Sequence, residues 1–164
     1  MTARSFIEAL ASAKPAADRA DKMNLYGWLI GRWTMDATVH LDDGGTHRGR
    51  GEIYFGWVLE GRAIQDVWIL PGVFHGTTLR VYDPNIDAWH ILWSDPLRQF
   101  YTRQIGRAQR AQGSDIVHKN DAGEAVRWSF TEITPASFRW LGERSRDDGK
   151  SWQLQAEFLA RRAS

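Results

Sequence analysis

The chain has 164 residues, of which 43% are hydrophobic and 25% charged, and 21 basic residues against 20 acidic ones leave a net charge of +1. This length and composition indicate one globular domain and argue against a wholly disordered chain. The charge balance argues against a nucleic-acid-binding protein, which usually carries a clustered basic excess. The absence of cysteine excludes disulfides, thiolate nucleophiles and cysteine-ligated metals.

The first 30 residues are predicted to be helical. The apolar residues within 6–10 follow helical spacing, and Pro15 ends that segment. Asp21 is expected to cap a second short helix, which carries Trp28 and ends at Gly31. The segment lacks the apolar run of about 7–15 residues that marks a signal peptide, and no stretch reaches the roughly 18 apolar residues of a membrane helix. We therefore expect a cytoplasmic protein with no membrane partner.

From Trp33 onward the hydrophobic period changes to two. Trp33, Met35 and Ala37 alternate with polar neighbours, as in a strand with one buried face. Turn-rich segments such as DDGG, LPG and DPNID separate further runs of this kind. The predicted strands are 33–41, 47–57, 62–70, 76–83, 87–94, 98–107, 114–119, 124–132, 137–145 and 151–161.

About ten short antiparallel strands at near-even spacing predict an all-β fold, a meander closed into a barrel without exposed edges. We expect a single domain over residues 1–164, with a short helical cap over 1–30 and the β-barrel over 31–161. The alternative is the α+β cone of polyketide cyclases and ketosteroid isomerases. That cone needs three substantial helices, and here the helical pattern stops near residue 30.

The more apolar alternate set of each strand is expected to face the barrel interior. On this basis seven of the nine tryptophans point inward, together with Leu79 and Val81 in the strand at 76–83. Trp68 lies in a strand without clear parity, and Trp28 lies on the helix that would cover one barrel mouth. The seven inward tryptophans are Trp33, Trp57, Trp89, Trp93, Trp128, Trp140 and Trp152.

Four stretches of this sequence carry a family resemblance: LIGRW (29–33), GWVLEGRAIQDVW (56–68), LRVYDPNIDAWHILWSD (79–95) and ERSRDDGKSWQ (143–153). In order and spacing they resemble the small bacterial calycin-like barrels, a lipocalin-like family of mostly unknown function that is distantly similar to nitrobindin. The resemblance implies a ten-stranded barrel with an N-terminal helical cap and an interior that holds an apolar ligand. Nitrobindin-type barrels bind haem through a histidine near the C-terminus. The last strand here, SWQLQAEFLARR, has no histidine, so we expect neither haem nor any other cofactor.

We expect the barrel to bind a small, apolar, aromatic molecule. Convergent indole rings are hard to pack without leaving a cavity, and they stack well on planar ligands. The alternative is a structural or dimerising domain whose barrel is filled by its own side chains, and a homodimer is compatible with either reading. The candidate ligand-binding residues are Trp33, Trp57, Gln65, Trp68, Trp89, Trp93, Gln104, His118, Trp128 and Trp140.

A further alternative is a cofactor-independent lyase, isomerase or cyclase that acts on an aromatic or polyketide-like molecule in the same cavity. Such an enzyme needs proton-transferring side chains inside the barrel. The candidates are Asp66, Tyr101 and Arg103, which lie in two strands of ambiguous parity. A binding protein would instead use Gln65 and Gln104 as neutral orienting groups. We predict that Gln65 and Gln104 face inward and that Asp66 and Arg103 face solvent.

Three further patterns predict no catalytic or metal-binding chemistry. No two histidines have HxH or HxxxH spacing, so we predict no metal site. His90, Ser94 and Asp95 have the residue types of a hydrolase triad, but they are too close along one strand to adopt its geometry. The stretch SRDDGKSW (145–152) has the form of an Asp-box, in which Asp147 is expected to bond turn amides and Gly149 to take a positive φ.

Overall fold

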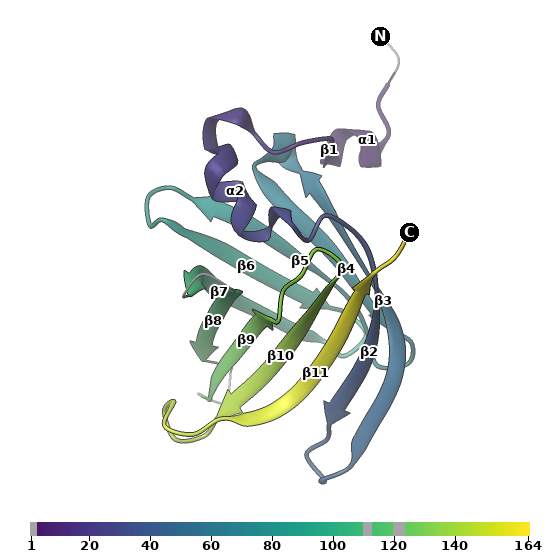
Figure 1. The fold of residues 1–164 in the computed structure, drawn as a ribbon, viewed down its shortest axis with the longest axis vertical. Coiled ribbons are helices and arrows are strands. Elements are labelled where there is room, and N and C mark those ends of the chain that lie inside the picture. The colour runs from purple at the N-terminus through teal and green to yellow at the C-terminus, as the bar shows by residue number, and fades with distance from the viewer. Residues whose placement is uncertain (1–2, 110–112, 120–123) are drawn as a thin grey trace.

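The computed structural model describes residues 3–109, 113–119 and 124–164, and the side chains of these residues except 109 and 113–119. Short N-terminal elements precede a strongly curled antiparallel sheet (Figure 1). The N-terminal elements are α1 (Phe6–Leu10), β1 (Ala11–Ser12), a 3₁₀ turn (Ala17–Arg19) and α2 (Ala20–Gly27). The sheet contains β2 (Gly31–His40), β3 (Thr46–Val58), β4 (Ala63–Leu70), β5 (Phe74–Asp83), β6 (Ala88–Asp95), β7 (Phe100–Gln109), β8 (Gly113–Lys119), β9 (Ala125–Thr131), β10 (Ser137–Ser145) and β11 (Gln153–Arg162).

Strand pairing passes from each strand to the next and from β11 back to β2. The ring is completed by β3, which pairs with both β2 and β4. One seam is short, because the described residues of β7 and β8 pair only from Gly106 to Gln109. The first residues of β7, 100–105, have described partners on β6 alone. The expectation of a closed barrel is therefore met only in part: the sheet curls into a barrel, but its wall is open along this side (Figure 1).

The strands arise where the sequence alternates. In β2, Trp33, Met35 and Ala37 are buried and the residues between them are not, which is the pattern of a strand with one face on a core. The predicted strands agree with the observed ones to within a few residues. The prediction for the second helix is wrong in detail: Arg19 is the N-cap of α2 and its side chain makes no capping hydrogen bond, while Asp21 lies inside the first turn. No helix among the described residues combines the length and apolarity needed to cross a membrane.

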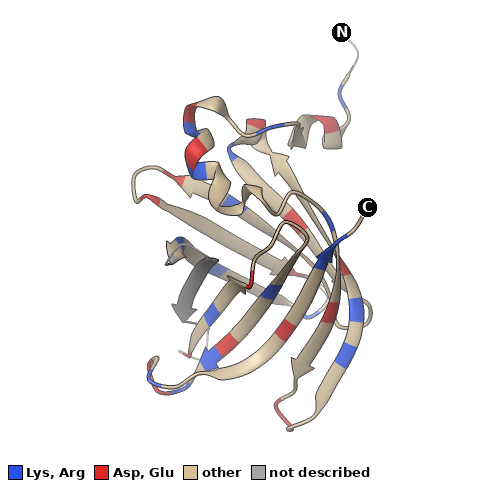
Figure 2. Ribbon diagram, viewed as in Figure 1, with Lys and Arg blue, Asp and Glu red and all other residues tan. Residues whose placement is uncertain are grey.

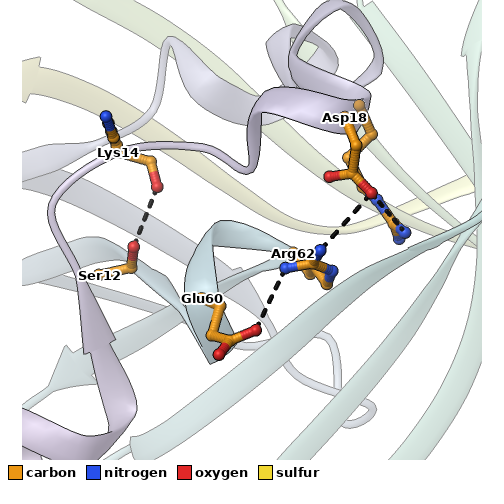
Figure 3. Close-up of polar contacts among 6 residues, drawn as sticks. Ser12, Lys14, Asp18, Glu60 and Arg62 are labelled. Carbon is orange, nitrogen blue, oxygen red and sulfur yellow. Dashed lines mark hydrogen bonds and ion pairs between the residues drawn. The ribbon is translucent and has the colours of Figure 1, made fainter.

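The N-terminal segment is tied to the barrel through the 3₁₀ turn Leu59–Gly61 between β3 and β4 (Figure 3). The Ala16 amide donates to the Gly61 carbonyl at 2.9 Å, and Arg62 pairs with Asp18 at 3.5 Å. Gly61 has a φ of +77°, and a Cβ there would collide with the Lys14 carbonyl. Only glycine readily adopts this positive φ and also leaves room for the Lys14 carbonyl. This turn therefore fixes where the N-terminal segment crosses the barrel end.

Basic and acidic residues are interspersed along the strands from β9 round to β3 (Figure 2), and ion pairs on the outer face of the sheet link neighbouring strands. Each of these strands takes part. Exposed pairs of this kind contribute little stability one by one, but they leave no large field of one sign on these strands. The pairs are Arg127–Glu143, Arg139–Glu157, Arg161–Asp36, Arg50–Asp36 and Arg32–Glu52.

The barrel interior has two halves that are packed differently. The half beneath α2, called the cap half, is filled by Met23, Tyr26 and Leu29 from the helical segment, all fully buried. They meet a layer of buried side chains from the strands, which are Trp33, Ile53, Trp89, Ile91, Phe130 and Phe138. The far half, reached by the last residues of β2, is called the open half and contains a cavity.

Candidate functional site

The open half contains a cavity of about 510 Å³ that opens to solvent on one side. Its wall is mainly aromatic, and Trp140 stacks on Phe158 with ring centroids 4.7 Å apart and an interplanar angle of 9°. Trp128 lies near Trp140 at 5.7 Å and is edge-on to Trp93 at 6.3 Å. Such rings present flat apolar faces against which a planar molecule can stack. The aromatic lining residues are Trp68, Phe74, Trp93, Phe100, Trp128, Trp140 and Phe158.

A buried ion pair forms the floor of the cavity and separates it from the cap half. Arg80, on β5, is 2% exposed and donates through Nη1 to Asp66, on β4, which is 1% exposed. The other carboxylate oxygen of Asp66 accepts the Thr78 amide at 2.7 Å. On the cap side, the guanidinium lies 5.3 Å from the Tyr26 ring centroid and 5.6 Å from that of Phe55, within cation–π range. Arg80 and Thr78 line the cavity, whereas Asp66 lies behind its wall.

Two more arginines lie at the cavity mouth, and each has acidic partners. Arg98 donates through Nε to Asp95 at 2.6 Å, and Asp95 is fully buried. Arg144 bonds Asp42 at 3.1 Å and pairs with Glu124 at 3.5 Å. The guanidinium groups therefore reach the cavity with their charges already compensated.

No protein-family model matches the chain, and no curated protein is similar to it in sequence. Among solved structures, it is similar to the S-type phycobiliprotein lyase CPES from Guillardia theta, with a TM-score of 0.64 and 13% identity over 92% of this chain and 99% of that chain. The fold is calycin-like. A second structure, EF1p2_mFAP2b bound to DFHBI, shows 14% identity over 87% of this chain and 99% of that chain, but its TM-score of 0.41 does not establish a shared fold.

The tryptophans that were predicted to bind a ligand lie in both halves of the calycin-like barrel. Trp68, Trp93, Trp128 and Trp140 line the cavity, as expected. The other predicted ligand-binding tryptophans, Trp33, Trp57 and Trp89, do not line it. Trp33 and Trp89 belong to the core of the cap half, and Trp57 is half-buried and packs against that core. Trp152, predicted to point inward, instead lies under Arg127, whose guanidinium is 4.2 Å from its ring centroid.

The two glutamines predicted to orient a ligand have different positions. Gln104 is buried as predicted, but it does not line the cavity, and neither its Oε1 nor its Nε2 has a partner among the described residues. The prediction for Gln65 is wrong: it is half-buried, lies on the opposite face of β4 from Asp66, and donates to Thr77 at 3.0 Å. His118 lies in β8, where the side chains are outside the described part of the structure.

The three candidate catalytic residues are not brought together. Asp66 is buried, contrary to the prediction, while Arg103 is exposed as predicted. Tyr101 is 55% exposed and donates to Gln99 at 2.9 Å. Tyr101 and Arg103 therefore lie on the outer face of β7, and neither lines the cavity with a group that could move a proton.

Sequence reasoning missed Arg80. The inner face of β5 was expected to carry Leu79 and Val81, which are half-buried, whereas Thr78, Arg80 and Tyr82 are buried. The less apolar set of β5 faces inward because the charge of Arg80 is compensated by Asp66 and its guanidinium is surrounded by aromatic rings. The available signal was the pair itself: Asp66 lies in a strand of ambiguous parity, and a guanidinium in the next strand can satisfy a carboxylate inside the barrel.

Outside the cavity, the remaining polar motifs are structural. The His90 ring shares a hydrogen bond of 2.9 Å with Asp83, and this contact lowers the pKa of Asp83. In the Asp-box hairpin, hydrogen bonds from Ser151 and Ser145 lower the pKa of Asp147 to about 2, and Gly149 has a φ of +86°. Among the described residues, no group of three or more His, Asp or Glu side chains is placed to hold a metal ion.

Proposed function

We propose that this calycin-like barrel binds a small, planar aromatic molecule in the cavity of its open half. The cavity itself is the observation that supports the proposal, because about 510 Å³ of space remains among seven aromatic side chains. Ligand pockets of proteins typically measure roughly 300–1,000 Å³ and are mostly apolar with a few polar groups. The alternative of a barrel filled by its own side chains fits the cap half but not the open half.

The enzyme alternative is less well supported by the same geometry. A lyase, isomerase or cyclase without a cofactor must place proton-transferring groups at the reacting atoms. Of its three candidates, Tyr101 and Arg103 are on the outer face, and Asp66 is occupied by Arg80 and the Thr78 amide. Binding requires only the aromatic wall and an entrance, and both are present.

The test is a titration with N-phenylnaphthylamine, an uncharged aromatic probe that becomes strongly fluorescent when it leaves water. The wild-type protein should enhance its emission in a saturable way with one site. Ala156 lines the cavity from β11, so Ala156→Phe should fill part of the space and weaken probe binding at least about tenfold, which corresponds to roughly 1.4 kcal/mol. Both proteins should be compared at equal folded fraction, measured by far-UV circular dichroism.

Leu159→Phe provides the matched control. It adds the same ring to the same strand, but Leu159 is exposed on the outer face. This variant should bind the probe as the wild type does. Absence of saturable binding by the wild type, or equal weakening by both variants, would contradict a ligand site in the cavity.

A further inference from the structure

Two side chains that line the floor of the cavity carry buried N–H donors without an acceptor among the described residues. A guanidinium carries five N–H donors. Nη1 of Arg80 donates to Asp66, and Nε of Arg80 has no acceptor among the described residues. Trp68, on the same wall, is 5% exposed, and its Nε1 also has no described acceptor. Both side chains line the cavity.

These donors differ from two indole nitrogens of the cap half, which have backbone acceptors. Trp33 donates to the Leu29 carbonyl at 2.7 Å and Trp28 to the Leu25 carbonyl at 2.9 Å. A buried donor without an acceptor destabilises the folded protein, because it has lost its hydrogen bonds to water. Unused donors at Arg80 and Trp68 are therefore a feature that a ligand with an acceptor atom would turn into binding free energy.

The charges on the floor and at the mouth indicate which kind of acceptor fits. Arg80 is compensated by Asp66, Arg98 by Asp95, and Arg144 by Asp42 and Glu124. An anionic group at the floor would lie close to the Asp66 carboxylate, and like charges at short range repel each other. An uncharged oxygen accepts from the same donors without that repulsion.

On the basis of the binding function proposed above, we propose that the ligand is an uncharged aromatic compound bearing an acceptor oxygen, such as an aromatic ketone or aldehyde, which lies with that oxygen against Arg80 and Trp68. The rings of the ligand then stack on Trp128 and Trp140, towards the mouth. The cap half offers no space for a longer molecule, because its aromatic layer directly underlies Arg80.

The probe for this test is prodan, a dimethylaminonaphthalene that carries a propionyl group. Two relatives serve as comparisons: the same ring system without the propionyl group, and the same ring system with a carboxylate in its place. Hydrogen bonds from charged donors are strong enough that prodan should bind about tenfold more tightly than the compound without the carbonyl. The carboxylate should bind more weakly than prodan. The emission of bound prodan should lie at longer wavelength than in an aprotic apolar solvent, because a hydrogen bond to its carbonyl shifts emission to the red.

The variant for this test is Arg80→Met combined with Asp66→Asn, because removing Arg80 alone would leave a buried unpaired carboxylate and could unfold the protein. In the double variant, prodan should lose its tenfold advantage and its bound emission should move to shorter wavelength. The compound without the carbonyl should lose less affinity than prodan, because it accepts no hydrogen bond from Arg80. Trp68→Phe, which keeps a ring and removes the N–H, should produce a smaller change in the same direction, and Arg103→Met on the outer face should change neither readout.

The outcomes separate this inference from the proposed function. If the wild type binds prodan and the carbonyl-free compound equally well, or binds the carboxylate most tightly, the assignment of an uncharged oxygen to the floor is wrong and the aromatic cavity stands. If none of the three compounds binds, the proposed function itself fails. Unchanged prodan affinity and emission in a folded double variant would also overturn the role of Arg80.

Discussion

The two halves of the barrel interior contain the same residue types in different arrangements. In the cap half, Trp33 is fully buried, contacts Phe138 edge-on at 4.8 Å, and has a backbone acceptor for its indole nitrogen. In the open half, Trp128 is half-buried and Trp68 has an indole nitrogen without an acceptor. Tryptophan content alone therefore predicts neither a core nor a site. The difference depends on whether helical side chains are present to fill the space between the rings.

The largest expected difference between the halves is in stability. Trp33→Ala should lower the free energy of unfolding by about 3–5 kcal/mol, because it leaves a closed cavity in a packed layer. Trp128→Ala should lower it by only about 1–2 kcal/mol, because one side of that ring already borders a cavity. Urea denaturation measures both values. If the two costs are equal, the open half is packed as tightly as the cap half, and the division described here is wrong.

The attachment of the cap depends on Arg162, the last residue of β11. Its guanidinium donates to the carbonyls of Trp28 at 2.7 Å, Ile30 at 2.8 Å and Pro135 at 3.0 Å, and lies 4.1 Å from the Trp33 ring centroid. Arg162→Gln should therefore lower the free energy of unfolding by about 1–2 kcal/mol. The expected loss is small for three hydrogen bonds because they are partly exposed to water.

Arg161→Gln is the matched control for this cap contact. Arg161 is the adjacent arginine and pairs with Asp36 at 3.2 Å on the outer face, so its replacement should change stability by less than about 0.5 kcal/mol. Thermal unfolding of the two variants side by side gives the comparison. Equal melting temperatures would show that Arg162 does not hold the cap.

The Asp-box hairpin between β10 and β11 belongs to the end of the barrel that carries the open half. Gly149 has a φ of +86°, so Gly149→Ala should cost about 1–2 kcal/mol in backbone strain. Gly56→Ala is the control, since Gly56 has no positive φ and a Cβ there would meet open space. Probe binding by the folded Gly149 variant should match the wild type. Lost binding at unchanged melting temperature would mean that the hairpin forms part of the ligand site.

The smallest expected effect is a pH dependence in the same hairpin. Hydrogen bonds from Ser151 and Ser145 lower the folded-state pKa of Asp147 from 3.8 to about 2. A lowered pKa stabilises the folded state above pH 3.8, and this stabilisation is lost as the pH falls towards 2. Asp147→Asn should therefore melt below the wild type at pH 6, and the gap should narrow between pH 4 and pH 2. A difference in melting temperature that stays constant with pH would show that ionisation of this carboxylate does not stabilise the turn.

The strands and the apolar wall could be predicted from the sequence because alternation is a local property. Trp93, Trp128 and Trp140 lie on the inner face for that reason. The floor could not be predicted by the same rule, since the inner position of Arg80 is favourable only with Asp66 beside it on the neighbouring strand. The predicted orientation of Gln65 was wrong for the same reason. Asp66 faces inward, so the adjacent residue Gln65 faces the other side of β4. The division into a filled and a hollow half also depends on tertiary packing, namely how far α2 reaches into the barrel.

The central claim is that an aromatic molecule occupies the open half of the interior and not the cap half. A crystal of the wild-type protein soaked with bromonaphthalene tests it most directly, because the anomalous signal of bromine locates the molecule without reference to the protein density. We expect one bromine peak between Trp68, Trp128 and Trp140, with the naphthalene rings stacked on an indole. A crystal in which these side chains have moved together to fill the space, with bromine found only on the outer surface, would contradict the account.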